Sequence, residues 1–387
     1  MTRKNLQGVS RRQALAMGGA AGVLAATGLP KGAFAQDKPE GLPDTMIWST
    51  YDVGSTGYVE ATAIADAMIK AYGTRVRLLP SGSGIGRILP LKNGQATTAW
   101  LANELFFATR GLYEFADKAW GPQNMRVILG RPSTYGLFAT KESGITSIAD
   151  IKGKRMAYAA ANPSVSIKND ALLASAGLTR DDVEVVEFPS YGDSLRALIN
   201  GQADVSGTST TAAVLYELEA SPRGIVWLPV DPNDQAVWDN MNKVAPIFAP
   251  VRETVGAGLS EENAVDLVAY RYPMVTVYED ADPDMVYGIF KGIDQTFDAY
   301  KDSTPIMKSW NIDLSGTPPM DAPFHEGAIR YLKEKDMWGE KEQAWNDRNV
   351  EEIQALIAAW EELMGRNLSD EEFQQAWAEK RDEIRAG

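Results

Sequence analysis

The sequence predicts an α/β protein that folds into two lobes, each built around a mainly parallel β-sheet. Strand-like segments are followed by loops of small residues and then by helical patterns, an order typical of parallel sheets. The same order begins again further along the chain. The 387 residues also exceed the roughly 250–300 at which a single hydrophobic core stops growing. These three observations favour two lobes over one.

The first 35 residues carry the features of an export signal. Ser10-Arg11-Arg12 precedes an apolar, Gly/Ala-rich run over residues 14–29, and Ala33-Phe34-Ala35 provides small residues for a signal peptidase. Paired arginines at this place are typical of the twin-arginine route, whose signals are addresses and not anchors. We therefore expect residues 1–35 to be a twin-arginine signal peptide. The mature chain then begins at Gln36 and works outside the cytoplasm.

The mature chain is strongly acidic and has no cysteine. Residues 1–35 contain five basic residues and no acidic ones, so 33 basic residues remain against 52 acidic ones, a net charge of −19. Such a surface repels nucleic-acid phosphates and anionic lipid, so neither is an expected partner. Without cysteine the chain has no disulfide and no thiolate nucleophile. No apolar run after Leu29 is long enough to span a bilayer, so we expect no membrane insertion.

The first lobe begins with two strand–loop–helix units. Residues 46–48 are strand-like and run into a Gly/Ser/Thr loop over residues 51–58, after which apolar residues recur at helical spacing. Residues 75–79 alternate as a second strand and stop at another loop of small residues, 80–86. Both loops therefore follow strands and precede helices.

The second lobe is predicted as an insertion in the first. Strand-like residues 125–129 and 135–140 lie on the two sides of a first crossing, near residues 131–136. Strand and helix patterns alternate beyond it, and strand-like residues resume at 226–230. We therefore expect the chain to cross back near residues 230–244.

The chain ends in a helical extension. Residues 350–363 and 371–384 form two amphipathic stretches, and Ser369 with Glu372 gives the second one a capping box. We expect an acidic helical hairpin packed on one lobe; an arm that docks a partner is the alternative. The predicted domains are lobe I, residues 36–133 and 243–338; lobe II, residues 134–242; and the helical extension, residues 339–387.

The motifs of enzymes and metal sites are not matched. His325 is the only histidine, which excludes histidine-rich metal sites, and we expect it to be structural. Arg87 stands where a dinucleotide-binding fingerprint requires glycine, and Ser81 stands where a nucleophile elbow requires glycine. We therefore expect no cofactor, no metal and no enzymatic activity. A hydrolase or lyase on this fold is a remote alternative.

Three loops that precede helices combine small residues with hydroxyl groups: residues 54–58, 81–84 and 162–166. Glycine lets backbone N–H groups approach a ligand, hydroxyl groups donate hydrogen bonds, and a helix N-terminus favours negative charge. Each loop alone is explained as a helix cap. Three of them at strand ends, divided between two lobes, predict that a small organic anion is held in the cleft.

Several short segments follow one another in an order and spacing shared with a known family. They are Gly54-Ser55-Thr56-Gly57-Tyr58, Gly82-Ser83-Gly84-Ile85-Gly86-Arg87-Ile88, Ser143-Gly144-Ile145, Gly153-Lys154-Arg155, residues 177–183 and 198–204, and His325-Glu326-Gly327-Ala328-Ile329-Arg330-Tyr331. Together they resemble the TAXI-type solute receptors of tripartite ATP-independent periplasmic (TRAP) transporters. The resemblance extends from about Met46 to Trp338.

The resemblance implies a type II periplasmic-binding-protein clamshell of two lobes. It also implies a non-enzymatic periplasmic receptor that delivers glutamate or a related small carboxylate, such as 2-oxoglutarate, to a TRAP permease. The chain departs from the family pattern at Gly84, which replaces a serine, and at Arg87, which replaces an asparagine. We expect the Arg87 guanidinium near the cleft, where its fork suits a carboxylate; a solvent-facing helix residue is the alternative. The C-terminal helices go beyond the family pattern.

The predicted ligand site takes side chains from both lobes, and the ligand shifts an open–closed equilibrium towards the closed state. Trp100 is a possible wall of the site, although core packing is the favoured interpretation. The same clamshell serving an ABC importer or a sensor kinase is the alternative for the partner. The candidate ligand-binding residues are Ser55, Thr56, Tyr58, Ser83, Arg87 and Asn103 in lobe I, and Ser164, Ser166, Asn169, Tyr191, Thr208 and Thr210 in lobe II.

Overall fold

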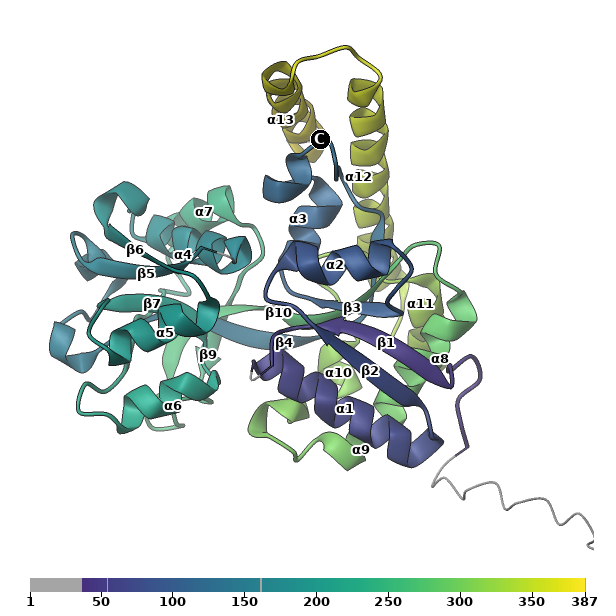
Figure 1. The fold of residues 1–387 in the computed structure, drawn as a ribbon, viewed down its shortest axis with the longest axis horizontal. Helices are drawn as coiled ribbons and strands as arrows, with labels where there is room; N and C mark the ends of the chain where they lie inside the picture. The colour runs from purple at the N-terminus through teal and green to yellow at the C-terminus, as the bar shows by residue number, and fades with distance from the viewer. Residues whose placement is uncertain (1–36, 54, 161, 387) are drawn as a thin grey trace, which may run out of the picture.

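The computed structural model describes residues 37–53, 55–160 and 162–386, and it consists of two α/β lobes and a C-terminal helical hairpin (Figure 1). The expected signal peptide, residues 1–35, lies outside the described residues. Within the described ranges, no helix is both long enough and apolar enough to cross a bilayer.

One mixed β-sheet runs through both lobes in the strand order β2-β1-β3-β10-β4-β7-β5-β6. Its strands are β1 (Thr45–Thr50), β2 (Arg75–Pro80), β3 (Thr98–Leu101), β4 (Met125–Ala139), β5 (Arg155–Ala159), β6 (Glu184–Phe188), β7 (Val205–Ser209), β8 (Val226–Trp227), β9 (Ala249–Glu253) and β10 (Val265–Tyr278). β1 is parallel to β2 and β3, and β5 is parallel to β6 and β7. The predicted α/β class with parallel cores in the lobes is confirmed.

β4 and β10 are the longest strands because each passes from one lobe to the other (Figure 1). They pair with each other in an antiparallel register in both lobes. β4 is one continuous strand where the sequence suggested two, and it crosses near the expected residues 131–136. It continues unbroken because antiparallel pairing with β10 supports it on both sides of the crossing.

The second crossing does not lie near residues 230–244. The helix that covers residues 235–244 packs against lobe II, and β9 pairs with the lobe II half of β10. The chain returns within β10, where the register to β4 shifts between Arg271 and Met274. The boundary expected at residues 242/243 therefore lies inside lobe II.

Side-chain caps begin the helices that follow the three predicted loops, and also the helix that follows Ser190. Ser55, Ser83, Asn162 and Ser190 each accept a backbone hydrogen bond from the first turn of a helix. The α-helices are α1 (Thr56–Tyr72), α2 (Gly84–Lys92), α3 (Glu104–Arg110), α4 (Pro163–Ser175), α5 (Tyr191–Ile199), α6 (Ala213–Ala220), α7 (Gln235–Val244), α8 (Pro283–Gln295), α9 (Phe297–Tyr300), α10 (Ile312–Ser315), α11 (Glu326–Glu334), α12 (Glu340–Met364) and α13 (Asp370–Ala386). Short 3-10 helices are η1 (Tyr113–Ala116), η2 (Lys141–Ser143), η3 (Ile148–Ile151), η4 (Arg180–Asp182) and η5 (Pro305–Trp310).

A buried ion pair joins the crossing strand β4 to lobe I. Arg131 donates from Nε to Glu60 Oε2 of α1 at 2.8 Å, and both side chains are almost fully inaccessible. The indole of Trp310 donates to the same carboxylate oxygen at 2.8 Å. Burial alone would lower the pKa of Arg131, but the adjacent Glu60 carboxylate outweighs it and raises that pKa. The guanidinium therefore stays charged.

We predict that Arg131→Met lowers the free energy of unfolding by about 3–5 kcal/mol, because it leaves the Glu60 carboxylate buried and unpaired. Arg252→Met is the matched control, since Arg252 pairs with Asp266 at an exposed edge and its loss costs about 1 kcal/mol or less. Urea unfolding of the two variants measures both values. Equal losses would contradict this role for the buried pair.

Candidate functional site

Two predicted residues from opposite lobes meet at the interface between β3–α3 and α4. The Ser164 hydroxyl, from the first turn of α4, donates to Asn103 Oδ1 at 2.8 Å. Lys168, one turn further along α4, donates from Nζ to the same oxygen at 2.6 Å and to Ser164 Oγ at 3.1 Å. All three side chains are buried. Lys168 was not among the predicted site residues.

The ammonium group of Lys168 is buried without a counter-ion. Its hydrogen-bond acceptors are neutral, and no carboxylate of the described residues forms an ion pair with it. The rings of Tyr135 and Tyr270 lie 5.3 Å and 5.0 Å from Nζ and provide cation–π contact. Burial lowers the pKa of Lys168 to about 8, an effect that more distant carboxylates reduce only in part. The site therefore has a cation that lacks its anion.

Three charged groups that form no hydrogen bond with Lys168 also shift its pKa. Glu104 at the start of α3 and Asp321 before α11 raise the pKa of Lys168, whereas the charge of Arg87 on α2 lowers it. Burial raises the pKa of Asp321 itself to about 7. Glu104 is already paired with Arg87, and Asp321 forms no ion pair with Lys168.

Arg87 is not the free guanidinium that the sequence suggested. Its side chain is buried and forms an ion pair with Glu104, and it also donates to Ser81 O at 2.9 Å. The guanidinium lies 4.0 Å from the centre of the Tyr51 ring. Burial would raise the pKa of Glu104, but the charge and hydrogen bond of Arg87 outweigh it and lower that pKa. The Arg87 guanidinium, which the sequence placed near a ligand carboxylate, is thus paired with the Glu104 carboxylate instead.

Tyrosine rings line the interface between the lobes. Tyr51 packs edge-on against Tyr272 at 5.0 Å, Tyr272 stacks on Tyr270 at 5.8 Å, and Tyr270 packs edge-on against Tyr135 at 5.9 Å. On the lobe II side, the Tyr191 hydroxyl shares a hydrogen bond with Thr208, which brings two more predicted residues together. Burial raises the pKa of each of these phenols, that of Tyr191 to about 12, so all are neutral at physiological pH.

Two amide groups next to Lys168 have unused donors. The Tyr135 hydroxyl donates to Asn169 Oδ1 at 2.8 Å, which leaves the Asn169 amide nitrogen free. Among the described residues, the Nδ2 atoms of Asn103 and Asn169 are buried and have no hydrogen-bond partner. Each of these two amide groups can therefore still donate a hydrogen bond to a group bound beside it.

The remaining predicted residues lie around this group without joining it. Ser55 and Ser83 cap α1 and α2, as the helix-cap alternative for these loops had it. Thr56 and Tyr58 are half-buried in the first turn of α1. In lobe II, Ser166 on α4 and Thr210 after β7 are both buried.

Two further sequence predictions concern the core. Trp100 lies between Trp48 and Trp310 in lobe I and is fully buried, as the core interpretation predicted. His325 caps α11 and accepts from Gly327 N at 3.1 Å, so it is structural as expected. No group of three or more metal-ligating side chains gathers within the described ranges.

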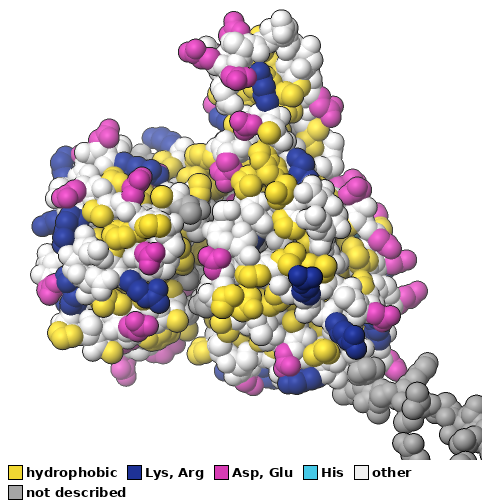
Figure 2. Space-filling model, viewed as in Figure 1, with side chains coloured by type: hydrophobic (Ala, Val, Ile, Leu, Met, Phe, Trp, Pro, Cys, Tyr) yellow, Lys and Arg dark blue, Asp and Glu magenta, His cyan; other side chains and the backbone are white. Residues whose placement is uncertain are grey.

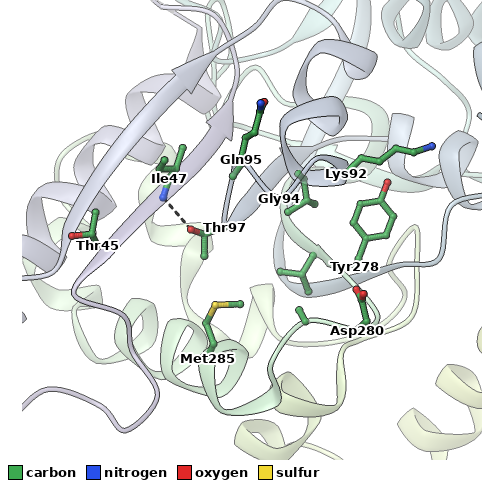
Figure 3. A pocket seen from close by; sticks show the side chains of 13 residues that line it. Thr45, Ile47, Lys92, Gly94, Gln95, Thr97, Tyr278, Asp280 and Met285 are labelled. Atoms are coloured by element: carbon green, nitrogen blue, oxygen red, sulfur yellow. Dashed lines mark hydrogen bonds between the residues drawn. The ribbon is translucent and has the colours of Figure 1, made fainter.

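An open pocket of about 690 Å³ lies at the end of the lobe I sheet where β1 and β3 begin (Figure 3). Its lining includes Thr45 at the start of β1, Thr97 before β3 and Asp280 after β10. The loop over residues 54–58 follows the other end of β1, and Asn103 follows the other end of β3, so this pocket is separate from the interlobe site. Thr97 already accepts a hydrogen bond from Ile47 N at 3.0 Å.

The face of the molecule shown in Figure 2 carries charges of both signs. Figure 2 shows a groove between the two lobes, with acidic and basic side chains spread over both of them. The Lys168 ammonium, by contrast, is buried in the interface between the lobes.

A sequence model of the NMT1-like family matches residues 50–335. The chain belongs to the NMT1-like family. The matched residues comprise both lobes of this family member, including β4 and β10, and stop before the hairpin of α12 and α13.

Solved structures similar to this NMT1-like chain include three binding proteins. The alkanesulfonate-binding protein SsuA from Xanthomonas axonopodis pv. citri, bound to MOPS, is 15% identical over 76% of this chain and 84% of its own, with a TM-score of 0.42. The periplasmic aliphatic sulphonate binding protein SsuA from Escherichia coli is 13% identical over 80% and 86%, also at 0.42. The amino acid ABC transporter substrate-binding protein AbpA from Streptococcus pneumoniae, bound to L-arginine, is 12% identical over 69% and 96%, at 0.42.

Lys168 was missed because a lysine on a helix is usually solvated. The available signal was its spacing, because position i+4 from Ser164 puts both side chains on one face of α4. Asn103 was found through its place directly after a strand. Tyr135, Tyr270 and Tyr272 lie on the crossing strands, whose path the sequence did not show.

We predict that Lys168→Met stabilises the ligand-free protein at neutral pH. The pKa of Lys168 falls from an ordinary value of 10.5 to about 8, so the folded state holds this proton less tightly than the unfolded state. The ammonium thus costs stability at pH values below about 8, and the cost fades between 8 and 10.5. At 1.36 kcal/mol per pKa unit, the gain in unfolding free energy is roughly 3 kcal/mol. Urea unfolding measured across this pH range checks the size and the pH dependence; a less stable variant at pH 7 would contradict it.

Proposed function

We propose that this protein is a periplasmic solute-binding protein that captures a small organic anion between its lobes. The observation that carries the proposal is the buried Lys168 ammonium, which has neutral acceptors and no counter-ion among the described residues. A buried charge is stable only when it is paired. An anion bound beside it completes the pair and accepts hydrogen bonds from the unused amide donors of Asn103 and Asn169.

Capture by lobe closure follows from where these groups lie. Asn103 belongs to lobe I, whereas Lys168 and Asn169 belong to α4 of lobe II. Only the closed arrangement brings the amides and the ammonium around one site, so an anion bound there favours closure. The tyrosine rings of the crossing strands form an apolar wall against the carbon skeleton of the ligand.

A binding role is favoured over catalysis by the state of the ionisable groups. The Glu104 carboxylate is held by Arg87 and accepts a hydrogen bond from the Tyr51 hydroxyl at 3.3 Å. The phenols are neutral because burial raises their pKa values. These groups bind and orient, and none of them is placed as a free general base.

We further propose that the ligand is a small carboxylate and that the partner is a TRAP permease. The order and spacing of the sequence segments that resemble TAXI-type receptors support this assignment. The twin-arginine pattern supports the periplasmic location. Reconstitution with the permease encoded beside this chain tests the partner: TRAP transport proceeds on an ion gradient, whereas an ABC importer requires ATP. Uptake that stops without ATP would contradict the TRAP assignment.

We predict that stabilisation by ligand follows negative charge. L-Glutamate, 2-oxoglutarate and succinate are compared by thermal shift and calorimetry with amide analogues that lack the acidic group. At least one anion is expected to stabilise the wild type, with the corresponding neutral amide inactive. Because truncating one member of a buried charge pair costs about 2–5 kcal/mol, Lys168→Met loses roughly 30-fold or more in affinity. Lys154→Met, on the exposed surface of lobe II, is the matched control.

Anion affinity is also expected to depend on pH. The competent form is protonated at Lys168, so affinity is constant well below pH 8 and falls above it by up to about tenfold per pH unit. Calorimetry across this range measures the profile. An affinity that is flat through pH 9, or an unchanged affinity in Lys168→Met, would refute the role of this ammonium.

A further inference from the structure

The segment that brings Asn103 to the anion site is too short to hold itself in place. Asn103 occupies the position before α3, a helix of only seven residues, all of them buried. Isolated helices shorter than about 12 residues are marginal in water, so tertiary contacts fix the position of this one. The contacts on its outer side come from the C-terminal hairpin, which rises beside α3 (Figure 1).

The hairpin forms hydrogen bonds with the carboxyl end of α3. Gly111 ends the helix in the left-handed region, at φ 59°, and its carbonyl accepts from Trp377 Nε1 at 2.8 Å. A Cβ at Gly111 would lie 2.7 Å from the Trp377 ring, so the indole is seated directly on this turn. Arg110 donates to Asn349 and Glu352 of α12, at 2.8 and 2.9 Å, and to Asp321 O at 2.7 Å.

The hairpin also holds the loop after α3. Gln374 of α13 donates to Ala116 O at 2.7 Å, and Lys118 donates to Leu368 O at 3.2 Å. This loop contains Tyr113, whose φ of 52° is strained for a residue other than glycine and persists only where the surroundings impose it. The Tyr113 hydroxyl donates to Val244 O of lobe II at 3.4 Å. One braced segment therefore contacts lobe II at both of its ends.

We propose that the C-terminal hairpin is a brace for the anion site, and that Trp377 is its main positioning residue. By fixing Gly111, Trp377 sets where α3 lies, and α3 sets where Asn103 meets Ser164 and Lys168 of lobe II. The brace lies outside residues 50–335, so it is an addition to the family core. The consequence for ligand affinity rests on the proposed function; the positioning itself does not.

Hydrogen–deuterium exchange of the ligand-free protein tests the positioning. Trp377→Ala is expected to speed amide exchange roughly tenfold or more, both in residues 103–107 and across the interface in residues 162–168. Trp377→Phe, which keeps a ring but loses the N–H donor, gives the same pattern with a smaller change. Trp345→Ala is the matched control, because Trp345 lies in the same hairpin but packs on Phe324.

The two outcomes of the exchange experiment are distinct. Faster exchange confined to residues 111–122, with residues 103–107 and 162–168 unchanged, would overturn the proposal. Equal changes in Trp377→Ala and Trp345→Ala would also overturn it, because they would indicate general destabilisation.

Binding to the anions of the panel separates this proposal from the proposed function. With the anion that stabilises the wild type, Trp377→Ala is expected to bind at least about tenfold more weakly, and Trp345→Ala to bind normally. Normal binding by Trp377→Ala would overturn the brace. If the wild type binds none of the anions, the proposed function fails, and the exchange experiment alone still decides the brace.

Discussion

The proposed binding site depends on the ammonium of Lys168, which lies in the interface between the two lobes and forms no ion pair with a carboxylate of the described residues. Arg87 and Arg131 are buried as well, but each has a carboxylate in the same lobe, whereas buried Arg126, away from the interface, donates to an amide oxygen and a backbone carbonyl. Lys168 has a shared amide oxygen, a serine hydroxyl and two tyrosine rings. Neutral acceptors and aromatic faces hold a cation in place without cancelling its charge, so its attraction for an external anion is preserved. Under the proposed function, pairing with an anion recovers the stability that this buried charge costs the ligand-free protein.

The two crossing strands place residues of both lobes at one interface. β4 and β10 are shared by both lobes, so their tyrosines remain in the interface while α3 and α4 approach from opposite sides. The buried pair of Arg131 and Glu60 ties the crossing region to lobe I. The proposed anion site is compatible with a strongly acidic chain, because the favourable charge acts at short range and out of water.

Local patterns in the sequence were enough to predict the parallel cores and to name residues that meet in the structure, such as Asn103 and Ser164. Long-range pairing accounts for what those patterns did not reveal. Residues 46–48 and 75–79 could be predicted as strands because the pattern of their apolar residues is visible within the segment itself. The second crossing was misplaced because the pairing of β9 with β10 depends on residues distant in the chain. Asn103 was found from its strand end. Arg87 was read as free because the partner that neutralises it, Glu104, comes from another helix.

The central claim is that the solute provides the missing counter-charge of Lys168. The most direct measurement is a high-resolution crystal structure of the protein with the solute that co-purifies with it, identified by mass spectrometry. The account predicts an acidic group of that solute within hydrogen-bonding distance of Lys168 Nζ and of the Asn103 and Asn169 amides, with the lobes closed around it. A solute bound elsewhere, or a neutral group against Lys168, would contradict it.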